Sequence, residues 1–161
     1  MKLEFEVVDR NDFKKCHRDL FAQMLEKQGK VRPSFADKID RCKTICIASI
    51  DGEPAAIGAI KKKTESDFSK DKSGLIQLKD KFNYELGYFF TAPDYVERKL
   101  ARSIAQLLIS HFGDENLMAS TEISANPAMV KILENNGFRL YGSPWKSSIH
   151  KSYLGLFLKV E

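Results

Sequence analysis

Residues 124–138 read SANPAMVKILENNGF, and this stretch predicts a helix with both of its ends specified. Asn126 can accept a hydrogen bond as the N-cap, and Pro127 suits the first helical position because its fixed φ and missing N–H cost little there. Gly137 can adopt the left-handed conformation that ends a helix, which lets Phe138 pack back on the last turn. The stretch therefore predicts a short helix with sharp boundaries, followed by a strand.

The rest of the chain alternates strand-like and helix-like segments. Apolar runs and alternations predict strands at residues 3–8, 44–50, 55–60, 84–91, 117–124, 139–141 and 153–160. Apolar residues at helical spacing predict helices at residues 11–28 and 34–42, and a long helix capped by Asp94. Ser34 and Asp37 have the spacing of a capping box. This order predicts an α/β fold with a mixed sheet flanked by helices.

Three local signals refine this prediction. The pair Asp51-Gly52 is the strongest turn signal in the chain and predicts a hairpin. Residues 61–83 are polar, so we expect a mobile loop with a short helical piece around residues 75–81. Gly87 lies inside a strand and indicates a bulge or a close backbone approach.

Composition is that of one ordinary globular domain. The chain has 161 residues, of which 43% are hydrophobic and 30% charged, so we expect a single domain over residues 1–161. A net charge of +4 suits an anionic ligand and does not indicate a dedicated nucleic-acid binder. Cys16, Cys42 and Cys46 lack metal-ligand spacing, and no apolar N-terminal run is present. We therefore expect a cytoplasmic protein with no bound metal and no membrane segment.

The helix after Asn126, which ends in Glu-x-x-Gly-Phe before a strand, resembles the acyl-CoA-binding helix of the GNAT family of N-acetyltransferases. The order of elements from residue 2 to residue 160 is similar to that family, and residues 84–138 match best. The resemblance implies a GNAT-like acyl-CoA N-acyltransferase fold. It also implies direct transfer of an acetyl group from acetyl-CoA, as co-substrate, to a primary amine.

The family holds the pyrophosphate of acetyl-CoA with a loop of the type Arg/Gln-x-x-Gly-x-Gly/Ala at a helix N-terminus. Residues 93–101 (PDYVERKLA) are similar, with Val96 at the first position, Lys99 at the central glycine and Ala101 as the one defining position kept. A side chain in place of glycine narrows the approach of a phosphate, whereas three basic side chains nearby favour it. The alternative is a solvated helix face. The resemblance implies cofactor contacts from Val96, Glu97, Arg98, Lys99, Leu100, Ala101 and Arg102.

Further cofactor contacts are implied by the same resemblance. Main-chain groups of Phe89, Phe90 and Thr91 would contact the pantetheine and the acetyl carbonyl, and Asn126 would contact the pantetheine arm. The family often has a tyrosine that reprotonates the thiolate four residues before the glycine of Gly-Phe. This chain has Leu133 there, so that role is absent, reassigned or left to water.

Transfer to an amine also needs a base that deprotonates the ammonium. Glu85 is the leading candidate, because some family members place a glutamate at the start of the central strand. Burial of a carboxylate on an apolar strand disfavours its charged form, so the carboxylate takes up a proton more readily than one in water. The alternative is an ordinary strand glutamate paired with a nearby lysine.

The acceptor pocket implied by the resemblance is formed by the first two helices and by residues 61–83 and 142–152. Trp145 and His150 are candidate substrate contacts, although Trp145 is equally suited to fill a packing gap. His17 and His111 lie in predicted helices and are expected to be structural. Family members often form a homodimer through the C-terminal strands, which are apolar enough here.

Two other functions fit the same residues. Val96, Lys99 and Leu133 differ from the residues that the family has at these positions. These differences would equally suit a catalytically inactive GNAT-fold protein that binds acyl-CoA or a partner. A third function is modification of an amine linked to nucleic acid, which is suggested by the basic residues Lys61–Lys63, Arg98, Lys99 and Lys146. Steep salt dependence of RNA or DNA binding would be the test. The acceptor itself stays open between a polyamine, an antibiotic-like amine, a protein N-terminus or lysine, and a charged tRNA.

Overall fold

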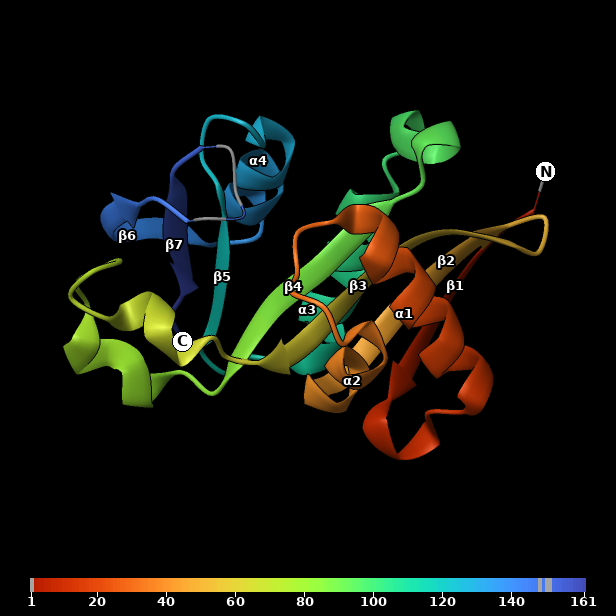
Figure 1. Ribbon diagram of the computed structural model, residues 1–161, viewed down its shortest axis with the longest axis horizontal. Helices are drawn as coiled ribbons and strands as arrows, with labels where there is room; N and C mark the ends of the chain where they lie inside the picture. Colours follow the sequence, from red (N-terminus) through yellow and green to blue (C-terminus); the bar gives the residue numbers. More distant parts are fainter. Residues whose placement is uncertain (1, 148, 150–151) are drawn as a thin grey trace. The chain divides into compact units, whose positions relative to one another are not determined.

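The computed structural model describes residues 2–147, 149 and 152–161. Among these residues, seven strands form one mixed sheet in the order β1-β2-β3-β4-β5-β7-β6 (Figure 1). The strands are β1 (Leu3–Asp9), β2 (Cys42–Ile50), β3 (Glu53–Lys62), β4 (Tyr84–Thr91), β5 (Leu117–Glu122), β6 (Arg139–Trp145) and β7 (Leu154–Lys159). The α-helices are α1 (Lys15–Gln28), α2 (Phe35–Lys38), α3 (Leu100–Phe112) and α4 (Pro127–Asn135). The α/β class expected from the sequence is confirmed.

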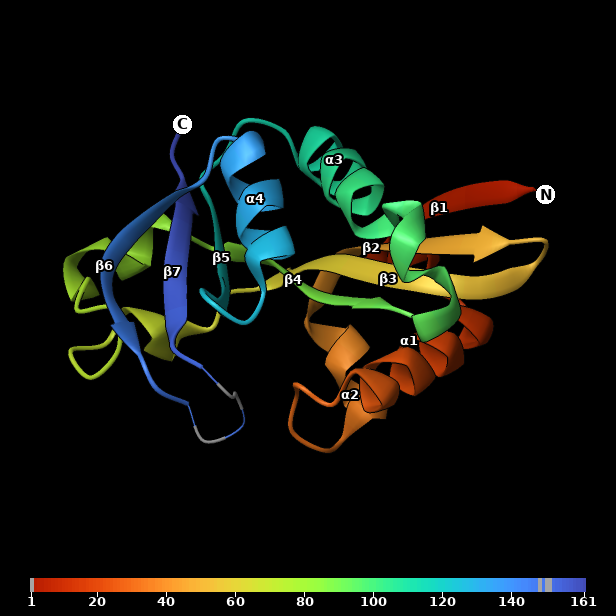
Figure 2. The same ribbon diagram turned by 90° about the horizontal axis from the view of Figure 1, so that it is seen from above.

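The residues cluster into two compact units, and the division falls inside β4. The first unit comprises Met1–Lys61 and Gly87–Phe112, and the second comprises Lys62–Leu86 and Gly113–Glu161. In the first unit, α1 and α2 lie on one face of the strands and α3 lies on the other (Figure 2). The core on the α1 side includes Phe21, Leu25, Ile45, Ile57 and Tyr88.

The hairpin of β2 and β3 confirms the strongest turn signal. Asp51 and Gly52 have φ values of 51° and 84°, and left-handed residues at both central positions are typical of a two-residue hairpin turn. The strands pair antiparallel, with Ile47 opposite Ile57. Both side chains are buried in the core, so the turn and the apolar pattern specify the same register.

The two N-terminal helices differ from the sequence prediction. A 3-10 helix at Arg10–Asp12 replaces the expected start at Asn11, and α1 begins at Lys15. The buried His17 ring caps α1, because its Nδ1 accepts the Lys14 N–H at 3.0 Å. The capping box expected at Ser34 is wrong, since Ser34 has a φ of 81° and its side chain makes no cap hydrogen bond. The second helix is consequently a four-residue α2 followed by a 3-10 turn.

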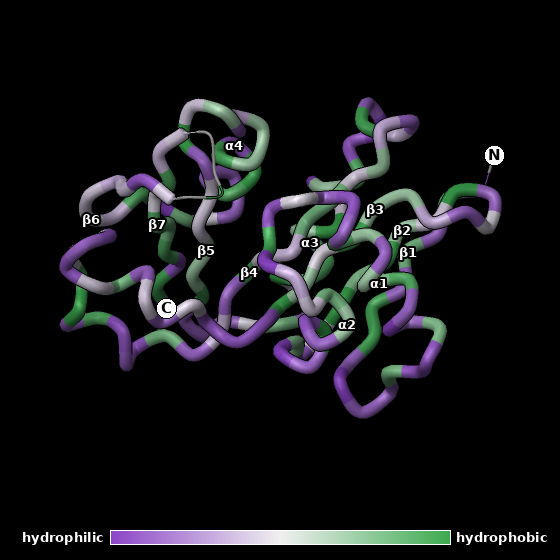
Figure 3. Tube along the Cα trace, in the orientation of Figure 1, coloured by the Kyte–Doolittle hydropathy of each residue, from purple (hydrophilic) through white to green (hydrophobic). Residues whose placement is uncertain are grey.

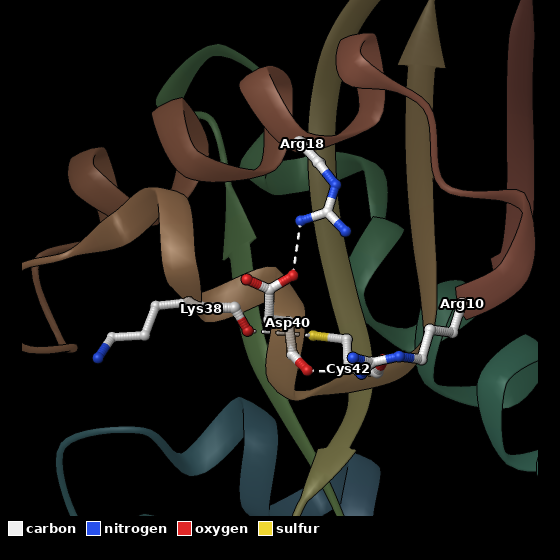
Figure 4. Close-up of polar contacts among 5 residues, drawn as sticks. All are labelled: Arg10, Arg18, Lys38, Asp40 and Cys42. Atoms are coloured by element: carbon white, nitrogen blue, oxygen red, sulfur yellow. Dashed lines mark hydrogen bonds and ion pairs between the residues drawn. The ribbon is translucent and has the colours of Figure 1, made fainter.

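Long-range polar contacts hold the segment of α2 and the 3-10 turn that precedes β2 (Figure 4). The Arg10 guanidinium donates to the main-chain carbonyls of Asp40 and Cys42, and Arg18 pairs with the Asp40 carboxylate at 2.7 Å. The Cys42 thiol lies 3.7 Å from the Lys38 carbonyl. The segment before β2 is therefore ordered by partners that are distant in the sequence.

The three cysteines should differ sharply in reactivity. Burial raises the pKa of the Cys42 and Cys46 thiols to about 12, whereas Cys16 is exposed. Only the thiolate reacts with an alkylating reagent, and at pH 8 a thiol with that pKa is ionised in about one molecule in 10⁴. Iodoacetamide should therefore modify one cysteine in the native protein and three in guanidinium, as counted by mass spectrometry. Rapid native modification at two or three sites would contradict the burial of these thiols.

The helix predicted after Asn126 is confirmed in the second unit as α4. The Asn126 side chain accepts the Met129 N–H at 3.3 Å, and Pro127 begins α4. Gly137 has a φ of 90°, and the Phe138 N–H donates to the Leu133 carbonyl at 3.0 Å. The Gly137 N–H also donates to the Glu134 carbonyl at 3.2 Å, and these two C-terminal bonds form a Schellman motif in which Leu133 and Phe138 are buried.

Residues 61–83 contain more structure than a polar loop. After β3 ends at Lys62, two 3-10 helices follow at Glu65–Phe68 and Ile76–Lys81, the second of which is the expected helical piece. The segment alternates hydrophilic and hydrophobic stretches (Figure 3). Phe68 and Phe82 are buried against each other, with ring centroids 5.8 Å apart. The segment therefore supplies core to the second unit.

Candidate functional site

The central strand β4 is irregular in its middle. Tyr88 has a φ of 59°, which is left-handed and unusual for a residue with a bulky side chain. The Tyr88 ring is buried, with Phe21 edge-on at 6.0 Å and the Lys61 ammonium 4.8 Å from its centroid. The irregularity expected at Gly87 thus lies one residue later. Such strain costs on the order of 1–3 kcal/mol and is concentrated at functional sites.

Beyond Tyr88, the main-chain groups of β4 alternate between two edges. The Ala92 N–H donates to the Ala55 carbonyl at 2.8 Å, so Ala92 faces β3. Because successive residues of a strand face opposite edges, Phe90 also faces β3, whereas Phe89 and Thr91 face away from it. Of the three residues expected to contact the cofactor through the main chain, Phe89 and Thr91 therefore have groups at the edge away from β3, where the Phe89 carbonyl accepts a hydrogen bond from Gln28 Nε2.

The Phe89 side chain occupies a tightly packed position next to α3. A Cβ on Gly58 would lie 2.6 Å from Ile104 Cγ2 and 2.8 Å from the Phe89 ring. Gly58 in β3 therefore leaves the space in which Phe89 and Ile104 pack. The position of Phe89 depends on this absence of a side chain.

The segment that resembles the pyrophosphate loop forms a 3-10 helix, Pro93–Arg98, followed by α3. Lys99 lies between them with a φ of 56°, and its carbonyl accepts the Ser103 N–H as the first bond of α3. The expected cap at Asp94 is wrong, because Asp94 lies in the 3-10 helix and α3 begins at Leu100. Lys99 thus has the left-handed backbone that glycine adopts most easily, at the position of the family's central glycine.

The start of α3 has the features of an anion site. The first N–H groups of a helix have no acceptor within the helix, and the N-terminus carries a partial positive charge. Arg98, Lys99 and Arg102 are exposed around it, and Val96 is 62% exposed. Leu100 is buried, so only its main chain can face a ligand. Amides and cations together suit a phosphate group.

Glu85 lies in the second unit at the start of β4, opposite Met118 of β5. Its side chain is 5% exposed, and Oε1 accepts the Thr64 N–H at 2.8 Å. The carboxylate is therefore held in place by the main chain of the segment after β3. A buried carboxylate with a fixed orientation can serve as a proton acceptor.

A second buried carboxylate was missed by the sequence analysis. Glu122 ends β5, is 7% exposed, and accepts the Ser152 N–H at 3.0 Å through Oε1. The available signal was the same as for Glu85, namely a single glutamate on an apolar strand.

The remaining predicted residues have different surroundings. The Asn126 amide caps α4 and its Nδ2 lies 3.4 Å from Thr121 Oγ1, so the cap function is confirmed and the cofactor contact stays a prediction. Trp145 ends β6 and packs in the core of the second unit, so it does not lie in a loop. His150 lies outside the described residues. No group of three metal-ligating side chains occurs among the residues described.

Comparisons with known proteins show the family and the fold. The family model described as acetyltransferase (GNAT) family matches residues 10–138. No curated protein sequence matches the chain. Within the described residues, no helix has the length and apolarity needed to cross a membrane.

Solved structures show the same fold at low sequence identity. Escherichia coli ElaA is 11% identical with a TM-score of 0.63, covering 97% of this chain and 99% of its own. The ribosomal-protein-S18-alanine N-acetyltransferase of E. coli is 13% identical with a TM-score of 0.63, covering 98% and 96%. The yncA protein of Salmonella typhimurium, solved with acetyl-CoA, is 12% identical with a TM-score of 0.63, covering 98% and 93%.

Proposed function

The chain belongs to the acetyltransferase (GNAT) family, and from this premise we propose that it transfers the acetyl group of acetyl-CoA to a primary amine. The observation that carries the proposal is the left-handed backbone of Lys99 at the start of α3. A lysine adopts this conformation at a cost of roughly 1–2 kcal/mol, which glycine would avoid. That Lys99 keeps the left-handed conformation despite this cost supports a functional role for the backbone at the start of α3.

The residues at this helix start fit the phosphates of acetyl-CoA. In the proposal, the main-chain amides at the start of α3 hold the pyrophosphate, and Arg98, Lys99 and Arg102 neutralise its charge. Main-chain groups of Phe89 and Thr91 hold the pantetheine and the thioester carbonyl, and Asn126 contacts the pantetheine arm. Acetyl-CoA supplies an activated acyl group when it is bound.

The chemistry assigned to the chain is proton transfer and positioning. Glu85 takes the proton from the acceptor ammonium, and the free amine nitrogen then attacks the thioester carbon. The carbon–sulfur bond breaks as the amide forms, the nitrogen releases its second proton to water, and the departing thiolate needs a proton. Leu133 is buried and carries no donor, so the proposal leaves this proton to water.

Thermal unfolding with acetyl-CoA tests the proposal. A ligand at about 100 times its dissociation constant stabilises the native state by roughly 2.7 kcal/mol. Stabilisation by acetyl-CoA together with thiol release in the presence of an amine would support the enzyme. No stabilisation at millimolar acetyl-CoA would overturn the proposal. Stabilisation without thiol release for any amine would favour an inactive acyl-CoA-binding protein.

Lys99→Gly separates the backbone of this position from its charge. The free protein should gain about 1 kcal/mol of stability, because glycine adopts the left-handed conformation without the steric cost. Acetyl-CoA should bind several-fold more weakly if the ammonium contacts a phosphate, roughly the effect of one charged hydrogen bond. Lys70→Gly removes the same charge from an exposed turn and is the matched control. Unchanged acetyl-CoA affinity in Lys99→Gly would assign phosphate binding to the main chain alone.

A further inference from the structure

The side chain of Gln28 is satisfied at only one of its two ends. Its Nε2 donates to the main-chain carbonyl of Phe89 at 2.5 Å, and this bond joins residues 61 positions apart. Its Oε1 is buried, and no hydrogen-bond donor reaches it from the described part of the chain. The structure thus contains an acceptor oxygen that is enclosed but unpaired.

The orientation of the Gln28 amide follows from its partner. A carbonyl oxygen can only accept a hydrogen bond, so the amide nitrogen must face Phe89, and a flipped amide would bring two oxygens together. The oxygen that remains is therefore Oε1. A buried acceptor without a partner costs about 1–3 kcal/mol, and native structures seldom leave one without a reason.

Two rigid features fix where this oxygen lies. Gln28 is the last residue of α1, which stops there because Gly29 has a φ of 75°. On the other side, Phe89 follows the left-handed Tyr88 in β4. The Gln28 amide is thus held between a helix end and a strand, which gives it the precision that positioning a ligand requires.

We infer that Gln28 Oε1 accepts an N–H of the acceptor amine and positions its nitrogen for attack. The inference rests on the proposed function, in which Phe89 main-chain groups hold the thioester. An attacking nitrogen must lie roughly 3–3.5 Å from the thioester carbon. Because the Gln28 side chain is bonded to Phe89, its Oε1 lies close to where the proposal places the thioester. An ammonium group has only hydrogen-bond donors, and a donor is the partner that Oε1 lacks. Gln28 is a positioning residue and takes no part in proton transfer.

The test measures the KM values of the two substrates separately by thiol release. The amines are spermidine, an aminoglycoside, a peptide with a free N-terminus and a lysine-containing peptide. Gln28→Met should raise the amine KM by about tenfold or more, the cost of one hydrogen bond to a charged group, with the acetyl-CoA KM nearly unchanged. Gln28→Glu also loses the bond to the Phe89 carbonyl but keeps an acceptor oxygen, so its amine KM should rise less than that of Gln28→Met. The control is Gln23→Met on the exposed side of α1, which should change neither KM.

Each other outcome overturns the inference in a distinct way. A rise in the acetyl-CoA KM alone would assign Oε1 to an amide of the pantetheine. Equal rises of the amine KM in both Gln28 variants would assign the effect to the bond with Phe89. Turnover by the native protein with an unchanged amine KM in Gln28→Met would overturn this inference and leave the proposed function intact. Absence of turnover by the native protein with every amine would instead overturn the proposed function, and the inference with it.

Discussion

Glu85→Gln is expected to lower turnover by about 10²- to 10⁴-fold at neutral pH, the usual contribution of a general base. Glutamine has the same shape and keeps an oxygen that can accept the Thr64 N–H, which Glu85 binds at 2.8 Å. The substitution therefore removes the proton acceptor and preserves the structural hydrogen bond. Thiol release measures the turnover, and thermal unfolding with acetyl-CoA should show a nearly unchanged affinity.

Glu122→Gln is the matched control for this result. Glu122 is as buried as Glu85 and also accepts one main-chain N–H, that of Ser152 at 3.0 Å. A large loss in Glu85→Gln with a small one in Glu122→Gln would assign the base to Glu85. The reverse pattern would transfer the assignment to Glu122. Equal loss of turnover and of acetyl-CoA affinity in Glu85→Gln would show that Glu85 is structural.

Gly58→Ala should reduce the free energy of unfolding by about 1–3 kcal/mol, the cost of adding a methyl group to a filled core. The new Cβ would lie 2.6 Å from Ile104 and 2.8 Å from the Phe89 ring, so at least one of them must move. Displacement of Phe89 would also disturb the main-chain groups proposed to hold the cofactor. We therefore expect weaker acetyl-CoA binding as well as lower stability, both measured by unfolding with and without the cofactor.

Gly155→Ala provides the comparison for Gly58→Ala. A Cβ at Gly155 in β7 would lie 2.7 Å from Leu140 and 2.8 Å from Ile123, so the contact distances are similar, but Leu140 is exposed and can move more easily than the buried Ile104. Those neighbours belong to the second unit and have no proposed cofactor contact. A loss of stability no larger than that of Gly58→Ala, with unchanged acetyl-CoA affinity, is expected. If both variants weaken binding equally, Phe89 has no special part in it.

The features predicted best from the sequence are those stabilised by neighbouring residues. The ends of α4 depend on Asn126 bonding to Met129 and on Phe138 bonding to Leu133, all within five positions. Strand β4 was likewise predicted with its observed bounds, Tyr84–Thr91, because a run of apolar and aromatic residues favours a buried strand.

The features predicted wrongly were the starts of two helices, each of which was placed at a side chain suited to a cap. Asp94 and Ser34 have suitable side chains for caps, but Pro93–Arg98 form a 3-10 helix and Ser34 adopts a left-handed backbone. The long polar segment was expected to be a loop, yet Phe68 and Phe82 within it meet in the core. A cap residue or a polar composition indicates what a segment can do, whereas packing decides which option it takes.

The strands, the Asp51-Gly52 hairpin and the bounded helix α4 could be predicted from the sequence, and the family resemblance rests on them. These depend on short-range bonds and on periodicity, which are visible along the chain. Three features appear only in the folded protein: the left-handed backbone of Tyr88 and Lys99, the burial of Glu85 and Glu122, and the bond from Gln28 to Phe89. Those features require partners that are far apart in the sequence, and a chain read in order gives no measure of which distant groups will meet.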